Sequence, residues 1–203
     1  MKNLLLVHYG PGPTSITKKI VADLNPFLKE NFNLEELDLV KTHPIIFTEE
    51  SMGAYVKRNY HGHELTDEES KHLTIPDNFA NQVLKADLLV MIFPMYNFQV
   101  PAVIKGWIDN VAQAKKVFKY TEYGPVGLSS IQKAFVVQVT GSTPSNSAKD
   151  FLTPYMDFIL KFIGVKEVKF EGIHGTKFLG EMADLKVQET TANLKKSLLL
   201  IKD

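Results

Sequence analysis

The sequence predicts an α/β protein with three layers, in which a doubly wound five-stranded parallel sheet carries helices on both faces. The chain has 203 residues, about the length of one domain. Hydrophobic residues make up 44% of it and charged residues 23%, as in an ordinary globular protein. Short apolar runs of strand length alternate with longer segments of helical spacing, and this alternation is typical of a parallel sheet.

Five apolar runs are expected to form the strands. They are uninterrupted or nearly so, as expected for strands that are covered on both faces. The second run alternates leucines with acidic residues, so we expect it near an edge of the sheet. The strands are predicted at residues 4–9, 34–40, 88–93, 134–139 and 165–173.

Apolar residues at helical spacing fill the intervals between these strands. The first helix follows a glycine–proline turn at residues 10–13, and another begins near Pro101. Gly164 is expected to close the helix that precedes the last strand. The crossovers between parallel strands are expected to be right-handed. Five parallel strands with helices on both faces predict a doubly wound, flavodoxin-like arrangement. The helices are predicted near residues 16–27, 79–84, 101–111, 151–163 and 185–201.

Residues 48–76 do not fit this alternation. The segment is polar and rich in charge and glycine, so we expect an excursion beside the sheet, either a lid or a subunit contact. The chain contains no internal repeat, low-complexity tract or glycine/serine linker. We therefore expect residues 1–203 to form a single domain.

The composition excludes several functions. Lysine plus arginine and aspartate plus glutamate both number 23, so the net charge is zero and nucleic-acid binding is not expected. The same neutrality counts against a small electron carrier, which would use a charge field to find its partners. The chain has no cysteine, so any redox role requires an organic cofactor. The G-x-S-x-G motif of many hydrolases is absent.

The sequence predicts neither export nor membrane insertion. The apolar run at residues 4–9 is too short for a signal-peptide core. No segment reaches the roughly 18 uninterrupted apolar residues of a membrane helix. We therefore expect a cytoplasmic protein that does not bind membranes.

Ligands of such sheets bind at the carboxyl ends of the strands, where the winding direction reverses. In the first loop there, the hydroxyls of Thr14, Ser15 and Thr17 and free helix amides can surround a monophosphate. The alternative is that these side chains only cap the helix. The three loops that meet this criterion are residues 10–17, 94–101 and 140–147.

The second of these loops carries two aromatic residues, a methionine and an asparagine between two prolines. A flat conjugated ring needs apolar walls and a few amide groups at its polar edge, which these residue types supply. The alternative is a proline-stiffened turn whose aromatic residues complete the core.

Four segments of the chain, in order along nearly its whole length, resemble the FMN-dependent NADH-azoreductase (NADH:quinone oxidoreductase) family. They are residues 94–98, 118–128, 153–155 and 162–164. The resemblance implies a non-covalent FMN, NADH as electron donor, and a homodimer with sites at the subunit interface. It further implies that quinones are reduced to hydroquinones, and azo compounds cleaved to amines, by ping-pong hydride transfer.

The resemblance also assigns site residues. The family's phosphate loop corresponds to Ser15, Ile16 and Thr17. The segment that lines the flavin ring corresponds to Pro94, Met95, Tyr96, Asn97 and Phe98. A Ser-Arg-Gly-Gly loop, whose backbone meets the ring's pyrimidine end, corresponds to Val139, Thr140, Gly141 and Ser142. This chain departs from that loop at three of the four positions, so ring contacts and redox potential there need not follow the family.

Phe118 is expected near the flavin face on which the substrate stacks, with packing in the core as the alternative. No catalytic side chain is expected, because hydride transfer mainly requires two rings in parallel contact. Two other classes of function stay open: a flavodoxin-type FMN electron carrier without turnover of small substrates, and a non-catalytic binding module suggested by the altered loop.

Two polar clusters receive simpler interpretations. His61 and His63 lack a third ligand at defined spacing, so we expect a solvated loop and no metal. Lys115, Lys116 and Lys119 are expected to be an exposed helix end, with attraction of nicotinamide phosphates as the alternative.

Overall fold

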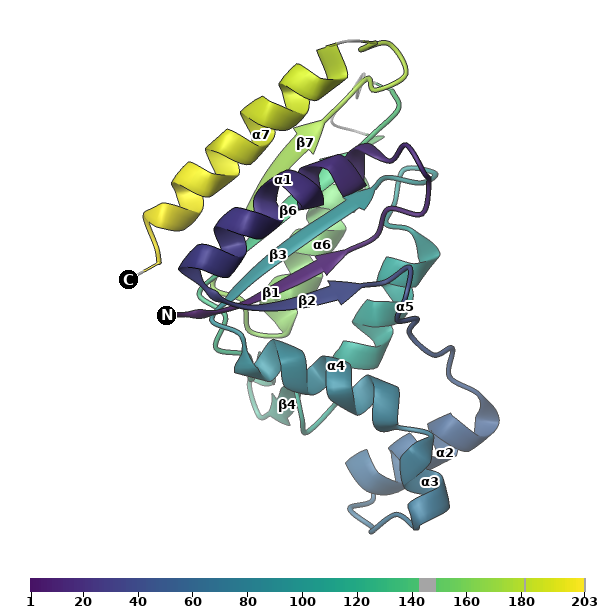
Figure 1. Ribbon diagram of the computed structural model, residues 1–203. Helices are drawn as coiled ribbons and strands as arrows, with labels where there is room; N and C mark the ends of the chain where they lie inside the picture. Colours follow the sequence, from purple (N-terminus) through teal and green to yellow (C-terminus); the bar gives the residue numbers. More distant parts are fainter. Residues whose placement is uncertain (143–148, 181, 203) are drawn as a thin grey trace.

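The computed structural model describes residues 1–142, 149–180 and 182–202. These residues form a five-stranded parallel sheet, which confirms the predicted fold class (Figure 1). The strand order is β2-β1-β3-β6-β7, so the second strand lies at an edge, as its alternating sequence predicts. The strands are β1 (Asn3–His8), β2 (Asn33–Asp38), β3 (Leu88–Pro94), β6 (Lys133–Val139) and β7 (Glu167–Ile173).

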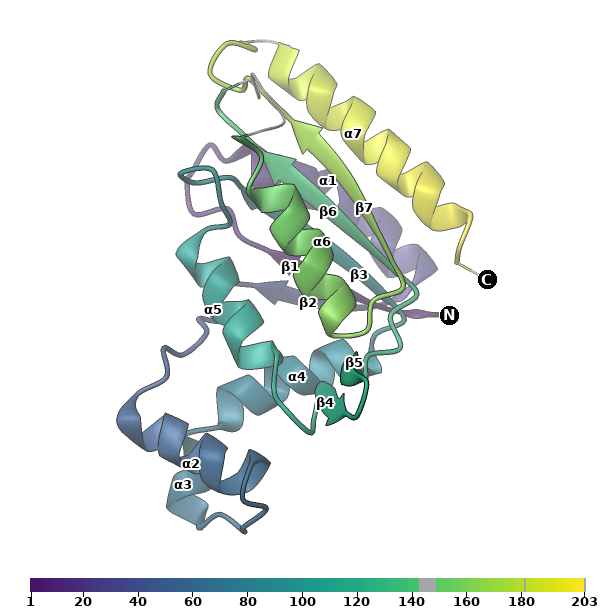
Figure 2. The ribbon, with the colours of Figure 1, turned by 180° about the vertical axis from the view of Figure 1, so that it is seen from behind.

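Helices cover both faces of this sheet. Helices α1 (Ile16–Asn31) and α7 (Met182–Leu199) lie on one face (Figure 1). The other face carries α4 (Thr74–Lys85), α5 (Ala102–Val111) and α6 (Leu152–Phe162) (Figure 2). Because successive strand side chains point to opposite faces, each buried strand contributes to two separate cores. This burial on both faces explains why the strands read as continuous apolar runs.

Two helices occupy the segment that did not fit the alternation. They are α2 (Glu49–Asn59) and α3 (Asp67–Lys71), which lie together beside the sheet (Figures 1 and 2). Each begins at a threonine, Thr48 or Thr66, whose side chain accepts a hydrogen bond from the backbone three residues later. These capping boxes give short polar helices defined starting points.

An antiparallel hairpin between α5 and β6 was not predicted. Its strands are β4 (Phe118–Thr121) and β5 (Gly124–Gly127), which lie near the ends of α5 and α6 in Figure 2. The hairpin packs closely on the end of α6, because a Cβ on Gly127 would fall within 2.1 Å of the backbone nitrogen of Gly164. Gly164 itself has φ 111° and ends α6 as predicted, with its amide bonded to the carbonyl of Lys161.

The last strand begins later than predicted. Val165 donates its backbone hydrogen bond to Leu160 in α6, so it still belongs to the helix end, and β7 starts at Glu167. Within residues 1–142, 149–180 and 182–202, no helix combines the length and apolar character needed to cross a membrane.

Candidate functional site at the carboxyl edge of the sheet

The sheet brings the predicted loops to one edge. The Tyr9 amide donates to the carbonyl of Ile92 at 3.0 Å, and the Met95 amide donates to Val139 at 2.8 Å. The rings of Tyr9 and Tyr96 meet edge to face with centroids 6.5 Å apart. The loops after β1, β3 and β6 are therefore neighbours. Residues 143–147, which the third predicted loop includes, lie outside the described residues.

The first loop leaves a helix N-terminus open to an anion. Ser15 stands at the N-cap of α1, yet within residues 1–142 its side chain makes no capping hydrogen bond. The first turn reads Ile16-Thr17-Lys18 and so carries no acidic side chain, and Thr17 is buried. Free amides at the positive end of a helix bind anions. Capping alone therefore does not account for the Ser15 hydroxyl.

Gly10 lets this loop fold back onto the helix. A Cβ at Gly10 would lie 2.8 Å from the Ser15 hydroxyl oxygen and 3.2 Å from the Thr17 Cβ. The loop backbone thus lies directly against the two side chains predicted to hold a phosphate. An added methyl group would displace them.

The second loop is a two-residue turn in a strained conformation. Tyr96 and Gln99 exchange two backbone hydrogen bonds, each 3.0 Å long. The residues between them, Asn97 with φ 49° and Phe98 with φ 67°, are both left-handed. Asparagine adopts this region fairly readily, whereas a bulky residue there is a genuine outlier. Such strain persists where the surrounding structure enforces it, and it clusters at functional sites.

The aromatic side chains of this turn do not complete the core. Tyr96 and Phe98 are 45% and 58% exposed, while Met95 packs against the core. A cavity of about 520 Å³ opens beside Tyr96, within the size range of small-molecule sites. Its lining consists of Tyr96, Asn97, Gln99, Val100, Pro101, Ala102, Lys105 and Tyr155.

Tyr155 places a neutral hydroxyl at this cavity. Burial, together with the nearby charge of Asp109, raises the pKa of the Tyr155 hydroxyl to about 12. Burial and the neighbouring Tyr9 also raise the pKa of Tyr96. Both phenols therefore stay protonated at ordinary pH and can donate hydrogen bonds.

The third loop is ordered by the segment that follows β7. The buried Thr140 hydroxyl donates to the Ser142 carbonyl at 2.5 Å and lies 3.4 Å from Nδ1 of His174. Burial lowers the pKa of His174, which favours its neutral form. The amide of Thr176 donates to the carbonyl of Thr140, and that of Gly175 to Ser142. The sequence did not point to residues 174–177, because they do not lie at the reversal of winding.

Phe118 lies near the amino ends of the strands, at the opposite end of the sheet from the three loops. Its side chain is only 6% exposed, and its ring centroid is 4.7 Å from that of Phe162 at the end of α6. The structure therefore brings together the predicted residues of the three loops but leaves Phe118 away from them in the same chain. Core packing, the alternative considered for Phe118, describes its surroundings within one chain.

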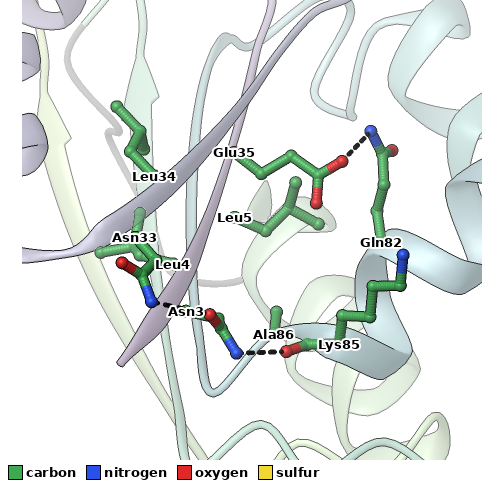
Figure 3. A pocket seen from close by; sticks show the side chains of 9 residues that line it. All are labelled: Asn3, Leu4, Leu5, Asn33, Leu34, Glu35, Gln82, Lys85 and Ala86. Atoms are coloured by element: carbon green, nitrogen blue, oxygen red, sulfur yellow. Dashed lines mark hydrogen bonds between the residues drawn. The ribbon is translucent and has the colours of Figure 1, made fainter. Parts of the chain in front are cut away.

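A second pocket, of about 430 Å³, opens at the amino end of β1 and β2 (Figure 3). Its polar side chains bond to one another: Gln82 donates to Glu35 at 3.0 Å, and Asn33 donates to Asn3 at 3.3 Å. It lies far from the three loops, at the other end of the strands. We therefore place the candidate site at the carboxyl edge.

The lysine cluster near residue 116 and the histidine pair at residues 61 and 63 lie outside the candidate site. Lys115 donates to the carbonyl of Tyr60 at 3.2 Å and so contacts the helical excursion, whereas Lys116 pairs at 2.8 Å with Asp77 on α4. The rings of His61 and His63 lie 6.1 Å apart. In the described part of the chain, no three histidine or acidic side chains gather into a possible metal site.

Comparisons with known proteins agree with this geometry. Residues 2–198 match a family described by its flavodoxin-like fold. An FMN-dependent NADH:quinone oxidoreductase 1 of Hahella chejuensis is 50% identical over 105 residues, 52% of each chain. An FMN-dependent NADH:quinone oxidoreductase of Azospirillum brasilense is 34% identical over 175 residues, 83% of each chain. The matched region thus spans about half of the first relative's length. An azoreductase structure from Bacillus anthracis str. Sterne superposes with TM-score 0.83 at 27% identity, covering 97% of this chain and 98% of its own.

Proposed function

We propose a function from the premise that this chain belongs to the flavodoxin-like family of the FMN-dependent NADH:quinone oxidoreductases. In our proposal the protein binds FMN, takes electrons from NADH, reduces quinones to hydroquinones and cleaves azo compounds to amines. The names of the relatives support the cofactor and the quinone substrate, and the azoreductase structure supports the azo substrate.

The observation that carries this proposal is the turn at Tyr96–Gln99. The strained backbone of this turn holds Asn97 and Phe98 at its tip, and Asn97 lines the adjacent cavity. A turn that only connected a strand to a helix would need neither a left-handed phenylalanine nor two exposed aromatic rings. A flat ring that packs against the turn, with its polar edge toward Asn97, uses both features.

The first loop fits the phosphate of FMN. Ser15 and Thr17 offer hydroxyls, and the free amides of α1 offer positive dipole ends without a competing acidic side chain. Because Gly10 has no Cβ, the loop leaves room for both side chains at the start of α1. Together these groups would solvate a dianion where α1 begins.

The division of labour follows from these placements. When bound, the flavin supplies the transfer of electrons from NADH to the acceptor. The chain binds and orients: Ser15 and Thr17 hold the phosphate, and residues 94–98 form a wall for the ring. The backbone of Thr140, Gly141 and Ser142 is fixed by its hydrogen bonds to residues 173–177. In the bound protein it would meet the pyrimidine end of the ring, as the family resemblance implies. No side chain needs to act as acid or base.

The placement of Phe118 supports a homodimer. Phe118 lies on the hairpin at the amino ends of the strands, so if it contacts a flavin, as the family resemblance implies, that flavin belongs to a second copy of the chain. Next to it, the rings of Tyr120 and Tyr123 are exposed and available for such a contact. We propose that the hairpin of one protomer closes the substrate site of the other. The cytoplasmic location expected from the sequence stays a prediction.

The decisive experiment is a flavin spectrum combined with steady-state kinetics. The purified protein is expected to be yellow, or to become so with added FMN, and to oxidise NADH only when a quinone or azo dye is present. A protein that remains colourless with excess FMN would contradict the proposal. A yellow protein that does not turn over NADH with either acceptor would instead be an electron carrier.

A further inference from the structure

The segment after β7 pairs with the loop after β6, beyond the carboxyl ends of these two strands, and fixes that loop. The amide of Thr140 donates to Ile173, and the amides of Gly175, Thr176 and Lys177 donate back to Ser142, Thr140 and Gly141, at distances of 2.9 to 3.3 Å. These bonds lock the backbone of residues 174–177 onto the 140–142 turn. The starting point of the Lys177 side chain is therefore defined, although the residue is exposed.

The stem of Lys177 lies across Gly141. A Cβ at Gly141 would be 3.2 Å from Cε of Lys177, 3.3 Å from Cγ and 3.5 Å from Cδ. Three carbons of the stem thus follow the surface of this glycine, and the ammonium group is one bond beyond the Cε. Among the ion pairs formed by residues 1–142, 149–180 and 182–202, none involves Lys177. Its charge therefore lies beside the 140–142 turn.

We propose that Lys177 supplies the positive charge beside the pyrimidine end of the bound flavin and raises its reduction potential. This inference rests on the proposed function, in which the 140–142 backbone meets that end of the ring. Thr140, at the arginine position of the related loop, is uncharged, and its hydroxyl is already bonded to Ser142. Reduction adds negative charge to this end of a flavin, and a nearby cation favours the reduced form.

The test compares three variants of the FMN-loaded protein. Lys177→Met keeps the length of the stem and removes the charge, whereas Lys177→Arg retains a charge. Lys166→Met makes the same change at an exposed lysine that precedes β7 at the opposite end of the strand. The measurement is the midpoint potential of the bound FMN, determined by spectroscopic redox titration against dyes of known potential.

Removing a unit charge a few ångströms from the ring should change the ratio of affinities for reduced and oxidised FMN by about tenfold. We therefore expect Lys177→Met to lower the midpoint potential by about 30 mV, the tenfold equivalent for a two-electron couple. Lys177→Arg and Lys166→Met should keep the original midpoint potential. The affinity of all three variants for oxidised FMN should stay within about threefold of that of the original protein.

Each result decides the inference. An unchanged potential in Lys177→Met, with FMN still bound, would overturn the role of Lys177 and leave the proposed function standing. An equal drop in Lys166→Met would also overturn it, because the effect would then be one of overall charge. Failure of the unsubstituted protein to take up FMN would instead remove the proposed function itself.

Discussion

Phe98 is the residue whose conformation is least favourable by itself. Its φ of 67° costs a residue with a Cβ about 1–2 kcal/mol, which the paired hydrogen bonds of Tyr96 and Gln99 sustain. The Phe98 side chain is mostly exposed, so its burial in the protein alone offsets little of this strain energy. The residue is thus better explained by what it contacts when a ligand is bound.

Phe98→Gly is therefore expected to separate stability from ligand binding. Glycine relieves the strain but adds freedom to the unfolded chain, so the free energy of unfolding should rise by up to about 1 kcal/mol. FMN affinity should fall, because one wall of the ring site is lost. Denaturant unfolding without flavin and a fluorescence titration with FMN measure the two effects. A clear loss of stability without flavin would contradict this account of Phe98.

Thr17→Val tests the proposed phosphate site. Valine keeps the shape of the buried side chain and deletes its hydroxyl. If a phosphate oxygen loses its partner there, FMN binding should weaken by about 1–3 kcal/mol. Riboflavin, which has no phosphate, is the matched control ligand and should bind as before. An unaltered ratio of FMN to riboflavin affinity would remove Thr17 from the phosphate site.

Residue types in the sequence suggest the chemistry that we propose for this site, whereas its geometry could not be predicted from them. Ser15 and Thr17 were identifiable because hydroxyls before a helix suit an anion, and Asn97 because a carboxamide between aromatic residues suits a polar ring edge. The left-handed φ of Phe98 and the stem of Lys177 over Gly141 have no local signature. They arise from pairing between distant segments, which only the assembled sheet reveals.

At the scale of elements, one carboxylate joins the helical excursion to the body. Asp77 on α4 accepts from both Nη atoms of Arg58 on α2, at 2.6 and 3.0 Å, and from Lys116 at 2.8 Å. Burial tends to raise the pKa of Asp77, but the hydrogen bonds and charges of Arg58 and Lys116 outweigh it and hold the pKa below 3.8, its ordinary value. The carboxylate is therefore charged in the folded protein throughout the neutral range.

The pH dependence of this junction follows from the sign of that shift. Because the folded pKa is depressed, the stabilisation is present above the ordinary pKa of 3.8 and is lost as the pH falls through the folded value. Below pH 3.8 we expect α2 and α3 to loosen before the sheet does, measured as lower amide-exchange protection factors, corrected for the intrinsic effect of pH, in residues 49–71. Asp77→Asn should show fast exchange already at neutral pH. If the protection factors of Asp77→Asn still fell with acid as in the original chain, a group other than Asp77 would be responsible for the loosening.

The elements that could be predicted are those with long apolar patterns. Strands β1, β3 and β6 and helices α1, α5 and α6 each bury enough side chains to leave a periodic signal. The β4–β5 hairpin has four residues in each strand and few buried side chains, and α3 buries none. Their positions depend on contacts such as Gly127 against Gly164, which no local pattern encodes.

At the scale of the whole molecule, the proposed site divides its residues between the two ends of the sheet. Asn97 lies at the carboxyl edge, whereas Phe118 lies near the end of α6 at the amino edge. If each site combines the turn of one protomer with the hairpin of the other, two different damaged chains can together build one intact site.

Mixing Asn97→Ala and Phe118→Ala chains tests this division. Each variant alone should reduce quinones poorly. After unfolding and refolding as an equal mixture, half of the dimers hold one intact site, so about a quarter of the original activity should return. Mixing two preparations of the same variant is the control and should restore nothing. Absence of recovery in the mixed sample would show that the two residues do not act across the interface.

The hairpin's attachment has a consequence for how acceptor preference can evolve. Its outer side chains, Tyr120, Tyr123 and Val126, are exposed, and it is attached to the body where Gly127 meets Gly164 and where the Phe118 ring packs on Phe162. Substitutions at the exposed tip of the hairpin are therefore not expected to disturb the packing of the sheet. If the hairpin closes the acceptor site as proposed, changes confined to residues 119–126 can alter the choice of acceptor while Phe118 and Gly127 keep the hairpin in place.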